Sequence, residues 1–282
     1  MGQVTRASGP QRYRYDSCMA TTYLDAIVAA HRARASVDTR TWQARVDALQ
    51  YDGPSFRAAL VSSLNPHVKV IAEIKRRSPS KGWIDEHLDP VSLALAYQEG
   101  GASAISVLTD EQFFAGSARD LENVRAATSL PLLRKDFVVC ENDVLDAVEM
   151  GASAVLLIVA ALDADELRRY FDLATRCNLD VLVEVHDDDE ARQAVQLGAG
   201  IVGVNQRDLH SFEVDPERAA KVSQSLQGVI KIAESGLTTP EDVARASESG
   251  FDAVLVGETF VRAADPSGAV RDFASVLRVV NG

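Results

Sequence analysis

The stretch that decides the fold is Val68-Lys-Val-Ile-Ala-Glu-Ile-Lys-Arg-Arg-Ser-Pro-Ser-Lys-Gly82. Its first half is a short apolar run rich in β-branched residues, which is typical of a buried strand. Glu73 and Lys75 stand two positions apart at the end of this run, so their side chains point to the same face. A polar loop follows. An α/β enzyme presents reactive groups in this way, although an ordinary ion pair at a strand end would show the same two residues.

The same alternation of apolar run and helical stretch recurs along the chain. Amphipathic stretches with helical spacing separate the runs, and Asp163, Asp188, Pro216 and Pro240 stand where helices are expected to begin. The predicted strands are residues 68–75, 104–109, 131–137, 154–160, 180–185, 201–205, 229–235 and 253–257.

A glycine recurs after the helical stretches at intervals of about 50 residues, as Gly101, Gly151, Gly198 and Gly250. We expect each to close a helix in the left-handed conformation before the chain enters the next strand. Nearly all-apolar strands that alternate with helices indicate a parallel sheet covered on both faces. This regularity favours an α/β fold of the (β/α)8 TIM barrel type. A doubly wound open sheet is the alternative, but no G-x-G-x-x-G motif follows the first strand.

The region before the first strand has helical character in three pieces, which end near Ser36, Leu49 and Leu64. We therefore predict one catalytic domain over residues 19–282, made of an N-terminal helical extension (19–66) and the barrel (67–282). Residues 1–18 lack the apolar core of a secretory signal, and we expect them to form a disordered N-terminal extension.

Composition narrows the function classes. The 282 residues fit one barrel of about 250 residues. A net charge of −12 and a pI of about 4.9 argue against non-specific nucleic-acid binding, and the apolar run 154–162 is too short to span a bilayer. Cys18, Cys140 and Cys177 are scattered and show neither a disulfide framework nor zinc spacing, which favours a reducing cytoplasmic location.

In a barrel, reactive groups lie at the carboxyl ends of the strands. Those ends carry Glu73, Lys75, Lys135, Glu184 and Glu234, which would bring two lysines and three carboxylates into one mouth. Such groups have coupled, shifted pKa values suited to acid–base work. Charges that merely bridge strand ends would explain any one of them. They explain all five poorly, because the strand interiors contain almost no other charge.

Weaker signals surround this group. Glycines at the ends of the last two strands would let backbone N–H groups approach a phosphate, although turn glycines look the same. Several apolar residues could line a flat pocket for an aromatic ring, although such residues more often belong to the core.

His186 shares a face with Glu184 but has no second histidine at ligand spacing, so we expect no metal site. Cys140 stands at a predicted helix start, where a thiol pKa can fall, but it lacks a matched base.

Six ordered motifs at these strand ends resemble the indole-3-glycerol phosphate synthase family of tryptophan biosynthesis. The resemblance covers the chain from about residue 20 to its end, including the helices before the first strand. The motifs are Ile71-Ala-Glu-Ile-Lys-Arg-Arg-Ser-Pro-Ser80, Leu133-Arg-Lys-Asp-Phe137, Leu156-Leu-Ile-Val159, Val183-Glu-Val-His186, Gly203-Val-Asn-Gln-Arg-Asp-Leu209 and Ile232-Ala-Glu-Ser-Gly236.

The resemblance implies a small-molecule substrate, 1-(2-carboxyphenylamino)-1-deoxyribulose 5-phosphate, which is ring-closed with loss of carbon dioxide and water. It implies neither an organic cofactor nor a metal. Lys135 would be the general acid on the carbonyl oxygen, and Glu184 the base of the later dehydration. Lys75 would bind the substrate and its phosphate and could protonate the leaving hydroxyl, while Glu73 and Asn205 would orient these groups. Which lysine serves which step stays open.

The resemblance also implies the binding residues. The anthranilate part would be surrounded by Ser78, Pro79, Ser80, Phe114, Phe137, Leu156 and Arg207, with Glu234 beside it. The phosphate would be held by Ser235, Gly236, Gly257 and Glu258. Many relatives carry a small serine where this chain has Glu258, so we expect only the Glu258 backbone to touch phosphate, with help from the hydroxyl of Thr259.

Three alternatives share the scaffold. The first is a sugar-phosphate isomerase like phosphoribosylanthranilate isomerase, which usually needs a cysteine and an aspartate where this chain has Glu73 and Lys75. A Schiff-base aldolase that uses Lys135 is the second, and a non-catalytic phosphate-ligand-binding barrel is the third. We expect a monomer that can associate with other tryptophan-pathway enzymes and has no nucleic-acid or membrane partner.

Overall fold

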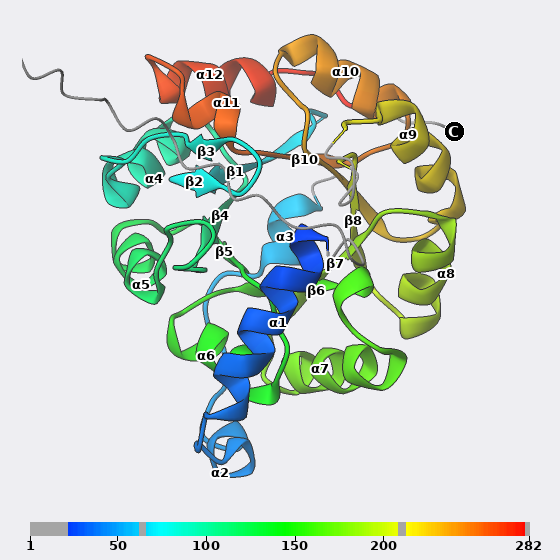
Figure 1. Ribbon diagram of the computed structural model, residues 1–282. Coiled ribbons are helices and arrows are strands. Elements are labelled where there is room, and N and C mark those ends of the chain that lie inside the picture. The colour runs from blue at the N-terminus through cyan, green and yellow to red at the C-terminus, as the bar shows by residue number, and fades with distance from the viewer. Residues whose placement is uncertain (1–21, 62–65, 208–212, 280–282) are drawn as a thin grey trace, which may run out of the picture.

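The computed structural model describes residues 22–61, 66–207 and 213–279, and within them the chain forms a closed barrel of eight parallel strands (Figure 1). The predicted TIM barrel is confirmed. The barrel strands are β1 (Lys69–Ile74), β4 (Ala104–Leu108), β5 (Leu132–Lys135), β6 (Ala154–Ile158), β7 (Asp180–Val185), β8 (Ile201–Asn205), β9 (Ile230–Glu234) and β10 (Ala253–Val256). The strands pair in sequence order, and β10 closes the ring against β1.

Helices surround the strands and cover their outer faces (Figure 1). They are α4 (Pro90–Glu99), α5 (Ala118–Ala127), α6 (Glu141–Glu149), α7 (Ala164–Arg176), α8 (Asp188–Leu197), α9 (Pro216–Ser225), α10 (Pro240–Glu248) and α12 (Pro266–Ala274), with the short η1 (Val159–Ala161) and α11 (Glu258–Val261) in loops. No helix among the described residues combines the length and the apolar character that a membrane crossing requires.

The predicted helix ends are largely confirmed. Gly101, Gly151, Gly198 and Gly250 have φ values of 89°, 78°, 87° and 86°, the left-handed conformation that a helix stop favours. The first helical residues of α9 and α10 are the predicted prolines, and Asp163 caps α7.

The prediction of Asp188 as an N-cap is wrong. Asp187 caps α8 instead, because its backbone is extended and its carboxylate accepts the Glu190 N–H. Asp188 is the first helical residue of α8.

Among the described residues, three helices precede the first strand, and the first and third of them lie at opposite ends of the barrel. The three helices are α1 (Tyr23–Ser36), α2 (Trp42–Val46) and α3 (Phe56–Leu60). Phe56 and Leu60 of α3 pack into the apolar barrel interior, and the Arg57 N–H donates to Asp180 at the start of β7 (2.9 Å). Thus α3 closes the amino end of the barrel, while α1 lies at the carboxyl end.

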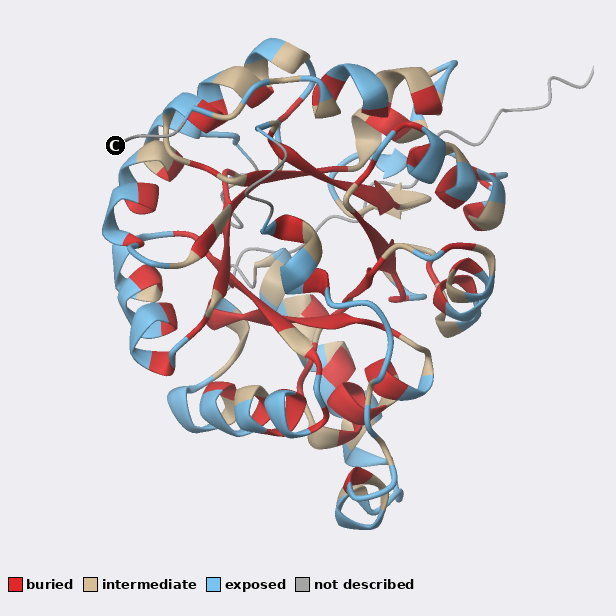
Figure 2. Ribbon diagram, turned by 180° about the vertical axis from the view of Figure 1, so that it is seen from behind, coloured by how far each residue is buried: buried red, intermediate tan, exposed pale blue. Residues whose placement is uncertain are grey.

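Strand alternation sets the interior. Inward-facing residues of β1, β5, β7 and β9 form an apolar layer of Ile71, Leu133, Leu182 and Ile232. The next inward position on each strand, two residues later, carries Glu73, Lys135, Glu184 or Glu234. Figure 2 shows the buried strands and the buried inner faces of the surrounding helices. The charged groups therefore stand on a packed apolar floor at the carboxyl end.

Two elements differ from the prediction. Residues 159 and 160, predicted as the end of a strand, belong to η1. The loop after β1 contains a short antiparallel hairpin, β2 (Arg77–Ser78) with β3 (Gly82–Trp83), where the sequence predicted only a polar loop. Gly82 has φ 73°, so the turn uses the conformational freedom of glycine. A two-residue strand is too short to leave a periodic signal in the sequence.

Candidate active site

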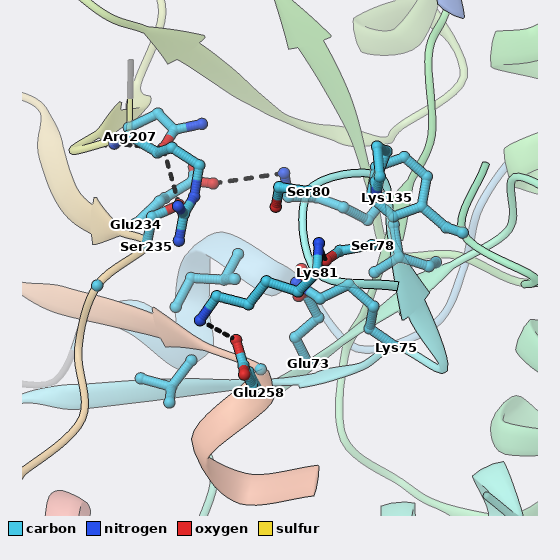
Figure 3. Close-up of a pocket in the computed structure, with 18 of the residues that line it drawn as sticks. Glu73, Lys75, Ser78, Ser80, Lys81, Lys135, Arg207, Glu234, Ser235 and Glu258 are labelled. Carbon is cyan, nitrogen blue, oxygen red and sulfur yellow. Dashed lines mark hydrogen bonds and ion pairs between the residues drawn. The ribbon is translucent and has the colours of Figure 1, made fainter. Parts of the chain in front are cut away.

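A cavity of about 410 Å³ opens at the carboxyl end of the barrel, and Figure 3 shows the side chains that converge on it. All of the predicted site residues line this one cavity. They are Glu73, Lys75, Ser78, Pro79, Ser80, Phe114, Lys135, Phe137, Leu156, Glu184, Asn205, Arg207, Glu234, Ser235, Gly236, Gly257 and Glu258.

Lys135 lies at the centre of the charged group. Its Nζ is 3.0 Å from Glu184 Oε2 and 3.4 Å from Glu234 Oε2. Burial alone would lower the pKa of Lys135, but the carboxylates of Glu184, Glu234 and Glu73 together raise it above its usual value. The side chain is therefore a cation that sits among oxygen acceptors.

The two carboxylates beside Lys135 have opposite pKa shifts. Burial would raise the pKa of Glu184, but the charges of Lys135 and His186 and a hydrogen bond from Asn205 lower it. The pKa of Glu234 is raised by burial and by the charges of Glu184 and Glu73, against the opposing effect of Lys135. Two neighbouring acids whose environments separate their pKa values form a pair in which one is ionised and the other holds a proton.

Two glycines make room for carboxylates. A Cβ at Gly203 of β8 would overlap the Glu234 carboxylate, and a Cβ at Gly257 would overlap that of Glu73. The Glu73 carboxylate also forms an ion pair with Lys75. The glycines therefore permit the acids to sit deep between neighbouring strands.

A hydrogen-bonded chain connects the end of β9 with Lys135. The Ser235 hydroxyl donates to Asn205 Oδ1 (2.8 Å), and Asn205 Nδ2 donates to Glu184 Oε1 (3.0 Å). Ser235 has φ 69° and Gly236 φ 74°, so two successive residues are left-handed, which is costly for serine. This turn points the Ser235 hydroxyl toward Asn205, which in turn orients Glu184.

The corner between β9 and β10 carries several charges. Glu258 Oε2 accepts from Lys81 Nζ at 2.7 Å, and Glu258 Oε1 accepts from Arg262 Nε at 3.1 Å (Figure 3 shows the Lys81 contact). Burial would raise the pKa of Glu258, but these two cations lower it. Thr259, whose hydroxyl was expected to help at the phosphate, lines the cavity, and this hydroxyl donates to the Leu237 carbonyl at 2.9 Å.

One wall of the cavity is apolar. The rings of Phe114 and Phe137 lie 6.3 Å apart, and Leu156 faces the same space from β6. Residues that the sequence did not assign to the site also line the cavity, among them Tyr23, Leu24 and Ile27 of α1, together with Lys81, Asp136 and Arg262. The spacing of α1 indicated a helix, but no pattern in it showed which end of the barrel it would cover.

Two further residues of interest lie outside the cavity lining. His186 is 3.5 Å from Glu184 Oε1, as strand parity predicted, and its Nδ1 lies 3.0 Å from Glu190. Cys140 stands at the start of α6, but burial and Asp143 raise its pKa to about 12. The helix start therefore does not lower the pKa of this thiol, for which the sequence already showed no matched base.

Comparison with known proteins agrees with this site. The model of the family described as indole-3-glycerol phosphate synthase matches residues 21–273. A relative of that name from Nocardioides sp. is 47% identical over 262 residues, which cover 90% of this chain and 98% of the relative. Another, from Chlorobium phaeovibrioides, is 48% identical over 228 residues, 76% of this chain and 88% of the relative.

Solved structures share the fold at low identity. A thiamine phosphate pyrophosphorylase from Pyrococcus furiosus aligns with a TM-score of 0.57 and 18% identity, over 75% of this chain and 96% of that one. These matches support the barrel alone. The sequence matches do not favour the isomerase or the non-catalytic alternative. From residue 21 to residue 273, the chain belongs to the indole-3-glycerol phosphate synthase family of carboxy-lyase enzymes.

Proposed function

We propose that the cavity ring-closes 1-(2-carboxyphenylamino)-1-deoxyribulose 5-phosphate to indole-3-glycerol phosphate, with loss of carbon dioxide and water. The observation that carries this proposal is the position of Lys135 between Glu184 and Glu234 on the floor of a cavity with one apolar wall. Such a site offers an acid, a base and a surface for an aromatic ring together.

Lys135 is the proposed general acid. The aromatic carbon that carries the carboxylate bonds to the ketone carbon, and the ketone oxygen takes a proton from Lys135 Nζ. The bond to the carboxylate then breaks, carbon dioxide leaves, and its electron pair restores the aromatic ring. The surrounding carboxylates keep Lys135 protonated before the step, since they raise its pKa.

Glu184 is the proposed base of the dehydration. Its lowered pKa keeps it ionised, and the hydrogen bond from Asn205 fixes its orientation. It accepts a proton from the ring-closed intermediate while the hydroxyl leaves with a proton from a lysine, so that water departs. Lys75, which pairs with Glu73, is the second proton donor in reach of this space and also binds substrate.

The two ends of the substrate are proposed to bind in separate regions of the cavity. The anthranilate ring lies against Phe114, Phe137 and Leu156, beside the hairpin residues Ser78 to Ser80 and Arg207. The phosphate lies at the backbone of Gly236, Gly257 and Glu258, beside Ser235 and Lys75. Because the Glu258 carboxylate is engaged by Lys81 and Arg262, its repulsion of a phosphate is reduced.

Turnover tests the function directly. The protein is incubated with the carboxyphenylamino-deoxyribulose phosphate, while indole fluorescence and released carbon dioxide are followed. The proposal expects one carbon dioxide for each indole product. A folded protein that releases neither would overturn it. Borohydride trapping of substrate on Lys135 would instead support the aldolase alternative.

We also propose that residues 19–282 form one catalytic domain with its helical extension at 19–66. The protein would act as a cytoplasmic monomer that can associate with other enzymes of the tryptophan pathway. The eight barrel strands have no free edge for pairing between copies, since β10 closes against β1, which supports a monomer. Light scattering of the purified protein, alone and with the neighbouring pathway enzymes, tests both expectations. The predicted extension 1–18 lies outside the described residues.

A further inference from the structure

A buried polar cluster lies beside the cavity, on the outer side of β4 and β5. It consists of His31 from α1, Thr109 and Asp110 after β4, and Arg134 and Asp136 at the end of β5; we call it the His31 cluster. His31 is 4% exposed, and Asp110 and Asp136 are each 3% exposed. Asp136 lines the cavity, whereas His31 and Asp110 do not, and the proposed reaction gives none of the three a part.

His31 connects the two carboxylates of this cluster. Its Nε2 is 2.8 Å from Asp110 Oδ2 and 3.8 Å from Asp136 Oδ1. Because a carboxylate only accepts, the hydrogen of the shorter contact belongs to His31. The second carboxylate oxygen of Asp136, Oδ2, accepts hydrogen bonds from the Thr109 hydroxyl (2.6 Å) and from Arg134 (2.8 Å).

Both carboxylates also hold the backbone of the apolar wall. Asp110 Oδ1 accepts the N–H groups of Phe113 at 2.6 Å and Phe114 at 2.9 Å. Asp136 Oδ1 accepts the N–H of Phe137 at 2.9 Å, and the His31 ring lies 5.4 Å from the Phe137 ring. One carboxylate thus fixes the backbone of each phenylalanine that lines the cavity, Phe114 and Phe137.

The helix that carries His31 forms the third part of the wall. Leu24 and Ile27 of α1 line the cavity, and His31 follows Ile27 by one helical turn on the same side. The hydrogen bond to Asp110 therefore holds α1 against the loop that carries Phe114. Three separate segments of the apolar wall meet at this single imidazole.

His31, Asp110 and Asp136 have the spacing of a metal site, since their possible ligand atoms lie within 4.8 Å of one another. Their hydrogen bonds favour a different role. Arg134 already supplies a cation to Asp136, and His31 supplies a donor to Asp110, so both carboxylates are engaged by groups of the chain itself.

We propose that His31 is a positioning residue for the aromatic half of the substrate site. It acts through Asp110 and Asp136, which hold Phe114 and Phe137, and through α1, which carries Leu24 and Ile27. This inference rests on the proposed function, because it assumes that the anthranilate ring contacts this wall. Loss of the His31 donor should weaken substrate binding more than the chemical step, since Lys135 lies on the opposite face of β5.

The test compares three variants in steady-state kinetics. His31→Leu removes the donor, and His31→Gln keeps an amide donor on a side chain of similar reach. Arg32→Ala is the matched control, because Arg32 is the next residue of α1 and ties that helix to Glu166 of α7 (2.7 Å) without touching the wall. A second readout is competitive inhibition by inorganic phosphate, which should depend on the opposite end of the cavity.

We expect His31→Leu to raise KM roughly 10-fold with kcat within about 3-fold of the wild type, and His31→Gln to recover most of the loss. Arg32→Ala should leave KM unchanged, and phosphate inhibition should be the same in all variants. An unchanged KM in His31→Leu, an equal rise in Arg32→Ala, or a loss confined to kcat would each overturn the inference.

A replacement variant and the activity of the wild type separate the possible outcomes. If His31→Leu does not fold, His31→Asn replaces it, because the asparagine amide is too short to reach Asp110, and its KM is compared with that of His31→Gln. A wild-type protein that turns over no substrate would contradict the proposed function itself, whereas active wild type with insensitive His31 variants would contradict only the role of His31.

Discussion

Two buried polar networks lie on opposite faces of strand β5, and they differ in what their carboxylates contact. On the inner face, Lys135 stands among Glu73, Glu184 and Glu234, and Glu234 Oε1 finds no hydrogen-bond partner among the described residues. On the outer face, Arg134 and the other members of the His31 cluster pair two carboxylates with a guanidinium and an imidazole.

This difference indicates that the inner network carries the chemistry, whereas the outer network positions other residues. Glu184 and Glu234 on the inner face have pKa values shifted in opposite directions, so the protonation of that network can change, which acid–base catalysis needs. On the outer face both oxygens of Asp110 accept hydrogen bonds, from His31 and from the backbone of Phe113 and Phe114, and such a network holds its members in one arrangement. Adjacent residues of one strand therefore serve different ends, because alternation sends Lys135 inward and Arg134 outward.

The largest effect is expected on the inner face. Lys135→Met should lower kcat roughly 10²–10⁴-fold, because it removes the proposed proton donor. The fold should survive, since the neighbouring carboxylates can take up protons once the ammonium is gone. Indole fluorescence measures kcat, and circular dichroism checks the fold. Product formation at a near-normal rate would refute the assignment of Lys135 as the acid.

A change on the outer face should act on stability instead. Arg134→Met leaves Asp136 buried without its guanidinium, and we expect the free energy of unfolding to fall by about 3–5 kcal/mol. Urea denaturation measures this loss. A variant as stable as the wild type would show that Arg134 does not offset the burial of Asp136.

The packing behind Glu234 gives a smaller effect. Gly203→Ala would push its Cβ against the Glu234 carboxylate and shift it relative to Lys135, so we expect kcat to fall roughly 10-fold. Gly200→Ala is the control, because a Cβ there meets only Arg57 at ordinary contact distance. Equal activity of the two variants would contradict the close approach of Glu234 to β8.

The smallest effect concerns pH. Burial, Glu184 and Glu73 raise the pKa of Glu234, so the folded state holds a proton that the unfolded state releases above about pH 4.3. The stability that this proton contributes is present below that pH and is lost as the pH rises through the raised pKa. Glu234→Gln should remove this dependence, changing the slope of the unfolding free energy against pH by up to about 1.4 kcal/mol per pH unit within the window. Parallel slopes for the two proteins would refute the shift.

Much of the fold follows from local patterns in the sequence. Apolar runs, helix-stop glycines such as Gly151 and the prolines at helix starts predict the barrel, because each acts within a few residues. The inward carboxylates and lysines also follow, since parity places Glu73 and Lys75 on one face. The hairpin of β2 and β3 does not, because two paired residues leave no periodicity.

The outer network could not be predicted for a different reason. His31 and Asp110 are separated by 79 residues, and their contact depends on which end of the barrel α1 covers. Helical spacing predicts that His31 lies on the buried face of α1, but it does not predict which residues pack against that face. The strand-end motif that contains Arg134 looked like part of the site, whereas alternation turns Arg134 away from the cavity that Lys135 lines.

The division between the two faces of β5 is tested most directly by one measurement. Single-turnover rates of folded Lys135→Met and Arg134→Met are compared at saturating substrate, with enzyme in excess. We predict that Lys135→Met forms indole roughly 10²–10⁴-fold more slowly than the wild type, while Arg134→Met stays within about 10-fold. Equal losses in the two variants would contradict the claim that one face carries the chemistry and the other holds it in place.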